Sequence, residues 1–119
     1  CAKPDHWLYE GTDMKEGDAV KGLVGWEWNG HPARDLPGHE ILATSNAVDG
    51  KNRPNSSHAA TIYNGPKDNV VFNAATIWWA QGLSSPPGHV LPANRHAQPQ
   101  GPDPRVQRMM ENVFDRFIK

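Results

Sequence analysis

Cysteine is almost absent from this sequence. Cys1 is the only cysteine among 119 residues, which excludes an intrachain disulfide framework and a metal site built from several cysteines. Because disulfides are rare in reducing compartments, this count favours such a compartment, and we expect a cytoplasmic protein.

Long hydrophobic runs and an excess of one charge are also missing. No stretch approaches the roughly 18 apolar residues of a membrane-spanning helix, and the first residues, CAKPDHWLYEG, lack the apolar core of a secretory signal. Twelve basic and thirteen acidic side chains give a net charge of −1, so no overall field attracts nucleic acid or an anionic membrane. We expect neither as a partner.

The chain length suits a single hydrophobic core. The 11 glycines and 11 prolines indicate that much of the backbone is loop. Because the sequence starts without methionine, we expect residues 1–119 to be either a single α/β domain or the C-terminal fragment of a larger domain.

Four segments have the residue types of β-strands, at 23–28, 40–45, 59–63 and 70–73. The last two are joined by NGPKDN, which is too short for a crossover helix, so these strands should pair antiparallel. The polar residues 49–57 predict a loop between the second and third strands.

Two helices are expected. AATIWWAQGL at 74–83 predicts a short helix that Gly82 ends in the left-handed conformation. Asp103 and Pro104 predict the start of a longer one, as N-cap and first residue, with Asn112 on its polar side. Its apolar positions predict a buried face made of Val106, Met109, Met110, Val113, Phe114, Phe117 and Ile118. Together these elements indicate an α/β fold in which helices cover a small mixed sheet.

Motifs for metal binding, nucleophilic catalysis and phosphate binding are missing. Six histidines are many for this length, but they show no H-x-H or H-E-x-x-H spacing and lie in loop-like sequence. We therefore predict solvated histidines and no metal site in this chain. The histidines are His6, His31, His39, His58, His89 and His96.

The junction after the fourth strand is the first candidate site. Asn73 to Thr76 follow the carboxyl end of that strand and open the short helix, where free backbone N–H groups can meet a ligand. The proline-rich segment 84–102, which carries His89, Arg95 and His96, could close over such a pocket.

A packing role for the same junction is an equal alternative. Thr76 could cap the helix, and Trp78 or Trp79 could fill the interface beneath the last helix. A second candidate site is the pair Trp26 and Trp28, which would share one face of a strand and stack against a sugar or another flat ligand. Burial of that face in the core is the favoured alternative, because Val24 extends the same face and large aromatic side chains usually lie in cores.

Three stretches resemble a known family. They are GLVGWEWNG at 22–30, NVVFNAATIWWAQGL at 69–83 and DPRVQRMMENVFDRFIK at 103–119, and they are similar to the C-terminal region of the N,N-dimethylformamidase large subunit and its relatives. DHWLYEGTDMKEGD at 5–18 is similar to the same region.

The resemblance implies a domain related to the class I glutamine amidotransferase fold, a flavodoxin-like sheet. It also implies an amidohydrolase that cleaves a small amide with iron held by tyrosine and carboxylate side chains. Neither Tyr9 nor Tyr63 matches the iron motif, and the amidotransferase cysteine elbow is missing. We therefore expect this chain to be scaffold without a cofactor of its own. The reactive centre would belong to the rest of the parent polypeptide or to a partner subunit.

Overall fold

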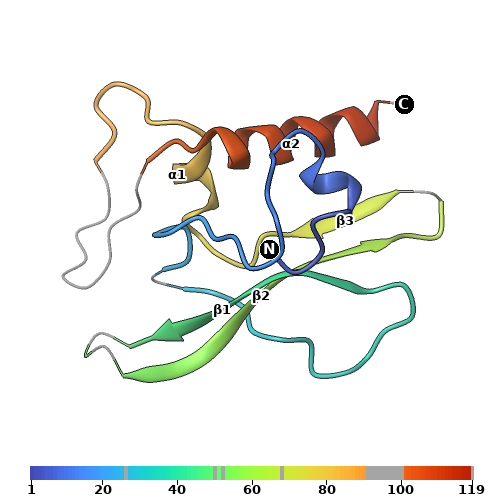
Figure 1. Ribbon diagram of the computed structural model, residues 1–119, viewed down its shortest axis with the longest axis horizontal. Helices are drawn as coiled ribbons and strands as arrows, with labels where there is room; N and C mark the ends of the chain where they lie inside the picture. Colours follow the sequence, from blue (N-terminus) through green and yellow to red (C-terminus); the bar gives the residue numbers. More distant parts are fainter. Residues whose placement is uncertain (26, 50, 52, 68, 91–100, 119) are drawn as a thin grey trace.

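The computed structural model describes residues 1–25, 27–49, 51, 53–67, 69–90 and 101–118. One short 3-10 helix, three strands and two α-helices follow one another in these residues. They are η1 (Trp7–Tyr9), β1 (Glu40–Val48), β2 (Pro54–Asn64), β3 (Val70–Asn73), α1 (Trp79–Leu83) and α2 (Pro104–Phe117). Figure 1 shows α2 lying across one side of the molecule, with the twisted strands on the other side.

The three strands form one sheet in the order β1-β2-β3, and both neighbouring pairs are antiparallel. The predicted antiparallel pairing of the last two strands is confirmed. The α/β arrangement with helices over a small sheet is also confirmed, and the sheet of the described residues is antiparallel throughout.

The predicted loop at 49–57 is wrong in its second half, because β2 begins at Pro54 and pairs with Val48. The Asp49 carboxylate closes the turn. One of its oxygens accepts from the backbone N–H of Lys51 and of Arg53, and the other accepts from the Arg53 guanidinium at 2.6 and 2.8 Å. A tight hairpin therefore replaces the loop.

The predicted strand at 23–28 is absent from the described residues of that segment, which exclude residue 26. Only Trp28 pairs, in an isolated antiparallel bridge with Thr76. The Glu27 N–H donates to the Gly25 carbonyl at 2.8 Å, a hydrogen bond between residues two apart that an extended strand does not make.

The predicted helix at 74–83 is shortened to Trp79–Leu83. Ala75 has a φ of 59°, which a right-handed helix does not allow. Gly82 was predicted to end the helix in the left-handed conformation, but it lies inside α1, and Ser84 is the C-cap. A Cβ on Gly82 would come within 2.9 Å of Leu23 and of Val106, so the missing side chain lets α1 pack closely on α2.

The last helix starts as predicted. The Asp103 side chain accepts from the Arg105 N–H at 2.9 Å, and Pro104 occupies the first turn. The side chains that α2 buries join residues of η1 and of all three strands in one core. Its buried members are Leu8, Tyr9, Met14, Leu42, Ile62, Val70, Val106, Met109 and Val113.

The buried face of α2 is narrower than predicted. Phe114, Phe117 and Ile118 are exposed, with 59% of Phe114 accessible to solvent. Asn112, predicted on the polar side, is buried and donates from Nδ2 to the carbonyls of Leu8 and Glu10 at 2.9 and 2.8 Å. These hydrogen bonds fix the helix against the N-terminal segment, so the face that includes Asn112 points inward.

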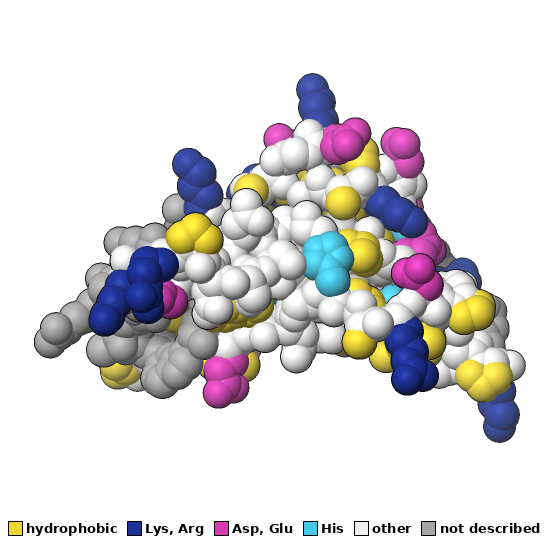
Figure 2. All heavy atoms as spheres, turned by 90° about the horizontal axis from the view of Figure 1, so that it is seen from below, with side chains coloured by type: hydrophobic (Ala, Val, Ile, Leu, Met, Phe, Trp, Pro, Cys, Tyr) yellow, Lys and Arg dark blue, Asp and Glu magenta, His cyan; other side chains and the backbone are white. Residues whose placement is uncertain are grey.

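The surface below the sheet carries its charges at the margins. Figure 2 shows Lys, Arg, Asp and Glu side chains around the edge of this face, with backbone and uncharged polar atoms over its middle. None of the described helices is long and apolar enough to cross a membrane.

Candidate functional site

An open groove of about 640 Å³ lies beside the end of β3. Its walls are residues 27–29, Ser56 and residues 72–77. Three of the predicted site residues, Asn73, Thr76 and Trp28, therefore line one groove.

The polar side chains of this junction hold its backbone. Asn73 Oδ1 accepts from the Ala75 N–H at 2.9 Å, an Asx-turn that supports the left-handed Ala75. Thr76 Oγ1 donates to the Leu23 carbonyl at 3.1 Å and accepts from the Trp78 N–H at 3.2 Å. Because these side chains replace helical hydrogen bonds, the helix starts late, and their oxygens are occupied by backbone groups.

Trp28 is the aromatic residue of the groove. Its indole Nε1 donates to Ser56 Oγ at 3.0 Å, which connects residues 27–29 to β2. The Asn29 carbonyl accepts from Ala59 and the Asn29 N–H donates to Ala75, so this segment bridges β2 and the junction. Trp26, its predicted stacking partner, lies outside the described residues. The remaining residues of 23–28 do not form the strand that was predicted to align the two rings.

The predicted lid residues do not assemble at the groove. His89 is exposed, and its Nε2 donates to Gln81 Oε1 at 2.5 Å on α1. Arg95 and His96 lie outside the described residues.

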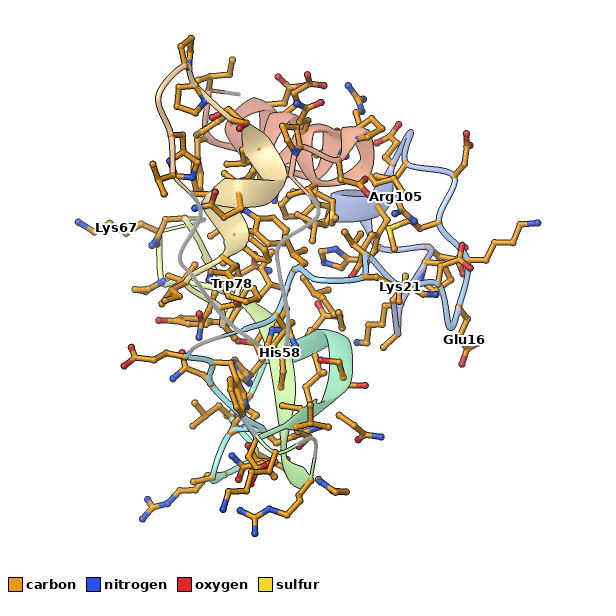
Figure 3. All side chains as sticks on the ribbon, turned by 90° about the vertical axis from the view of Figure 1, so that its left-hand side faces the viewer. Glu16, Lys21, His58, Lys67, Trp78 and Arg105 are labelled. Atoms are coloured by element: carbon orange, nitrogen blue, oxygen red, sulfur yellow. The ribbon has the colours of Figure 1, made fainter. Side chains whose placement is uncertain are left out.

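The packing role for the junction has direct geometric support. Trp78 is only 1% exposed and lies directly beneath α1 in Figure 3, and Trp79 packs edge-on against Phe72, with ring centroids 5.4 Å apart. Thr76 accepts from the Trp78 N–H in the turn before α1. The junction therefore anchors α1 to the core and also forms the wall of the groove.

His58 is the titratable residue that sequence reasoning missed. It was predicted as a solvated loop histidine, but it lies in β2 and is 4% exposed; Figure 3 shows it in the strand layer. Its Nε2 is 2.9 Å from the Ala74 carbonyl. Burial lowers the pKa of His58, the hydrogen bond to Ala74 opposes this, and the charge of His31 lowers the pKa further.

A signal for this burial exists in the sequence. His58, Ala60 and Ile62 alternate along β2, and alternate side chains of a strand share one face. The predicted strand starts at Ala59, one residue after the histidine, so the prediction leaves His58 outside the alternating face.

The described residues hold neither a metal cluster nor a nucleophile paired with a base. No three His, Cys, Asp or Glu side chains among them come together as metal ligands. Within the same residues, no serine, threonine or cysteine side chain hydrogen-bonds to a histidine, an arrangement that nucleophilic catalysis commonly uses.

Residues 1–97 match the family model described as "N,N-dimethylformamidase beta subunit-like, C-terminal". The chain belongs to this family, and the resemblance seen in the sequence is confirmed. The match ends before α2. No curated protein and no solved structure matches the chain.

Iron bound by tyrosine, which the resemblance implies for the parent enzyme, does not fit the two tyrosines of this chain. The Tyr9 hydroxyl donates to the Leu42 carbonyl at 2.8 Å, and burial raises the pKa of Tyr9 to about 12, whereas metal ligands must lose their proton. Tyr63 is exposed and lies beside the His39 ring in a tilted arrangement, with centroids 5.9 Å apart.

Proposed function

We propose that this chain is a C-terminal scaffold segment of a dimethylformamidase-like amidohydrolase and that it lacks a complete active site. One observation carries the proposal: the side-chain oxygens of Asn73 and Thr76 in this junction are hydrogen-bonded to backbone. Groups used in this way fix the backbone that lines the groove. They are poorly suited to proton transfer, which needs a free donor or acceptor beside the substrate.

In this proposal the groove beside β3 is one wall of the substrate pocket. Trp28 supplies an apolar surface for the carbon groups of a small amide. The remaining walls, the catalytic residues and any iron belong to the rest of the parent polypeptide or to a partner subunit in the cytoplasm. The antiparallel sheet would be one part of a larger amidotransferase-like, flavodoxin-like domain.

Turnover of the 119-residue chain tests this proposal. Incubated with N,N-dimethylformamide, with and without added ferrous iron, the chain is expected to release no dimethylamine. Release of dimethylamine by the chain alone, whether or not an iron chelator stops it, would overturn the proposal.

A ligand-binding module is the second candidate function, and the groove that Trp28 lines favours it. Oligosaccharides are suitable probes, because tryptophan rings such as Trp26 and Trp28 stack against sugars, and the segment 84–102 would be a further contact. Titration while following the Trp28 indole N–H by NMR is expected to shift that signal. Asp115→Ala, on the exposed side of α2 and outside both the groove and residues 84–102, is the control that should keep this shift. An unmoved Trp28 signal with every sugar would rule out this candidate.

A further inference from the structure

A second cavity lies next to the groove beside β3, since Phe72, Ala74 and Thr76 line both. Its volume is about 100 Å³. Leu42, Met14, Phe72 and Met109 give it a largely apolar lining, and the exposed Asp18 lies on its rim.

Three polar atoms of the lining residues are buried without a hydrogen-bond partner among the described residues. They are Ser45 Oγ, His58 Nδ1 and Trp79 Nε1. A buried donor or acceptor left unpaired loses its hydration without replacement, which is a substantial cost for a folded protein. Three such atoms around one cavity indicate a place that is built for a polar molecule.

Ser45 and His58 face each other across the sheet. They are directly paired in the register of β1 and β2, and opposite side chains of an antiparallel pair lie on the same face of the sheet. The two side chains therefore present their polar atoms from adjacent strands to the same cavity, while Trp79 contributes from α1.

The hydrogen bond to Ala74 determines what His58 offers. A carbonyl oxygen only accepts, so the proton of the ring lies on Nε2, 2.9 Å from the Ala74 oxygen. In the neutral imidazole, which burial favours, Nδ1 is then an acceptor. Ser45 can donate and accept, and the Trp79 indole N–H can only donate.

These groups specify the ligand. It needs a donor for His58 Nδ1 and an acceptor for the hydroxyl of Ser45 or the indole of Trp79. The apolar lining favours carbon groups beside this polar end and disfavours a net charge. At about 100 Å³ the cavity is smaller than the roughly 300–1,000 Å³ of ordinary ligand pockets and takes only a few heavy atoms.

We propose that this cavity binds a small uncharged molecule that carries one hydroxyl-type donor, one acceptor and a short apolar body, such as a short-chain alcohol. The polar residues of this site, Ser45, His58 and Trp79, do not line the groove beside β3, so a test at these side chains addresses the cavity and not the proposed scaffold role.

Two solvents of equal heavy-atom number test the site. 2-Propanol can donate to His58 and accept from Ser45 or Trp79, whereas acetone can only accept. Titration of the isotope-labelled chain with 2-propanol is expected to give saturable shifts of the His58 ring nitrogens and of the Trp79 indole N–H. Acetone should bind about tenfold more weakly, because it leaves Nδ1 unpaired.

Ser45→Ala removes one of the polar partners and is expected to weaken 2-propanol binding severalfold. Ser57→Ala, on the same sheet but outside the cavity, is the matched control and should leave binding unchanged. If the Ser45→Ala chain does not fold, the ratio of 2-propanol to acetone affinity in the unsubstituted chain decides the proposal.

Linear shifts of equal size with both solvents would show a general solvent effect and would overturn the proposal. The proposal would also be overturned if water cross-peaks to the Trp79 indole N–H persisted at every 2-propanol concentration, because bound water would then keep its place in the cavity. Saturable binding of 2-propanol with weaker binding of acetone would support it.

Discussion

Gly25 lies directly against the indole of Trp78. A Cβ at this glycine would come 2.0 Å from Cζ3 and 2.3 Å from Cε3 of the Trp78 ring. Trp78 is almost completely buried, so the ring has little room to withdraw. The backbone of residue 25 and the tryptophan before α1 therefore determine each other's position.

Gly25→Ala should destabilise the chain by about 3 kcal/mol, since an added methyl group in a packed core forces a shift of the backbone or the ring. The free energy of unfolding in urea measures this effect. Gly65→Ala is a suitable control: the three atoms nearest to its Cβ all belong to the side-chain amide of Asn69, which can turn away. A Gly25→Ala chain as stable as Gly65→Ala would contradict the packing described here.

Asn112 joins α2 to the N-terminal segment. Its Nδ2 donates to the carbonyls of Leu8 and Glu10, and Asn112→Ala would leave the buried Leu8 carbonyl without this donor. We expect a loss of about 2 kcal/mol. Asn112→Asp keeps the shape of the side chain but places a carboxylate oxygen against the two carbonyl oxygens. The free energy of unfolding should therefore fall by at least as much. Asp115→Ala, on the exposed side of α2, should change little.

The sequence predicts those elements that local signals define. The short linker between β2 and β3 leaves only an antiparallel pair, and Asp103 with Pro104 marks the start of α2. The inward face of α2 could not be predicted, because apolar residues cover a wide arc of the helix. The hydrogen bonds of Asn112 to the carbonyls of Leu8 and Glu10, about one hundred positions earlier, determine which part of this arc is buried.

The candidate site could be predicted only in part. The residues Asn73 and Thr76 were found from their place after a strand, and they do line a groove. The hydrogen bonds of their side chains to the backbone could not be predicted. They depend on the left-handed Ala75 and on the Leu23 carbonyl, which is distant in the sequence. The segment before Trp28 has strand-forming residues, but its contact with Trp78 at Gly25 favours a bend over extension.

Met109 and Phe114 test the orientation of α2. Met109 is 4% exposed within the core, so Met109→Ala should cost about 2–5 kcal/mol through lost burial and a cavity. Phe114→Ala should cost less than about 1 kcal/mol, because most of its ring already meets water. Thermal or urea unfolding of both variants measures the difference. A larger loss for Phe114→Ala would mean that α2 presents its other face to the core.

The burial of His58 should make stability depend on pH. Its pKa in the folded chain is lowered from the ordinary value of 6.5 by burial and by the charge of His31, and the Ala74 hydrogen bond only partly offsets this. The unfolded chain therefore binds a proton more readily than the folded chain between the two pKa values. The stabilisation is complete above the unfolded pKa, and it decreases as the pH falls through 6.5 toward the lower folded value.

Urea unfolding between about pH 7.5 and pH 5 checks this dependence, and His58→Gln is the informative variant because glutamine can still donate to Ala74 but does not titrate in this range. The free energy of unfolding should fall with pH more steeply in the unsubstituted chain than in His58→Gln. His6, whose pKa is also lowered by burial, adds a slope of the same sign to both chains, so it does not affect their difference. The ion-paired carboxylates Glu40 and Asp103 have lowered pKa values and lose their contribution only at more acid pH. Equal slopes for the two chains would show that His58 takes up its proton in the folded state as easily as in the unfolded one.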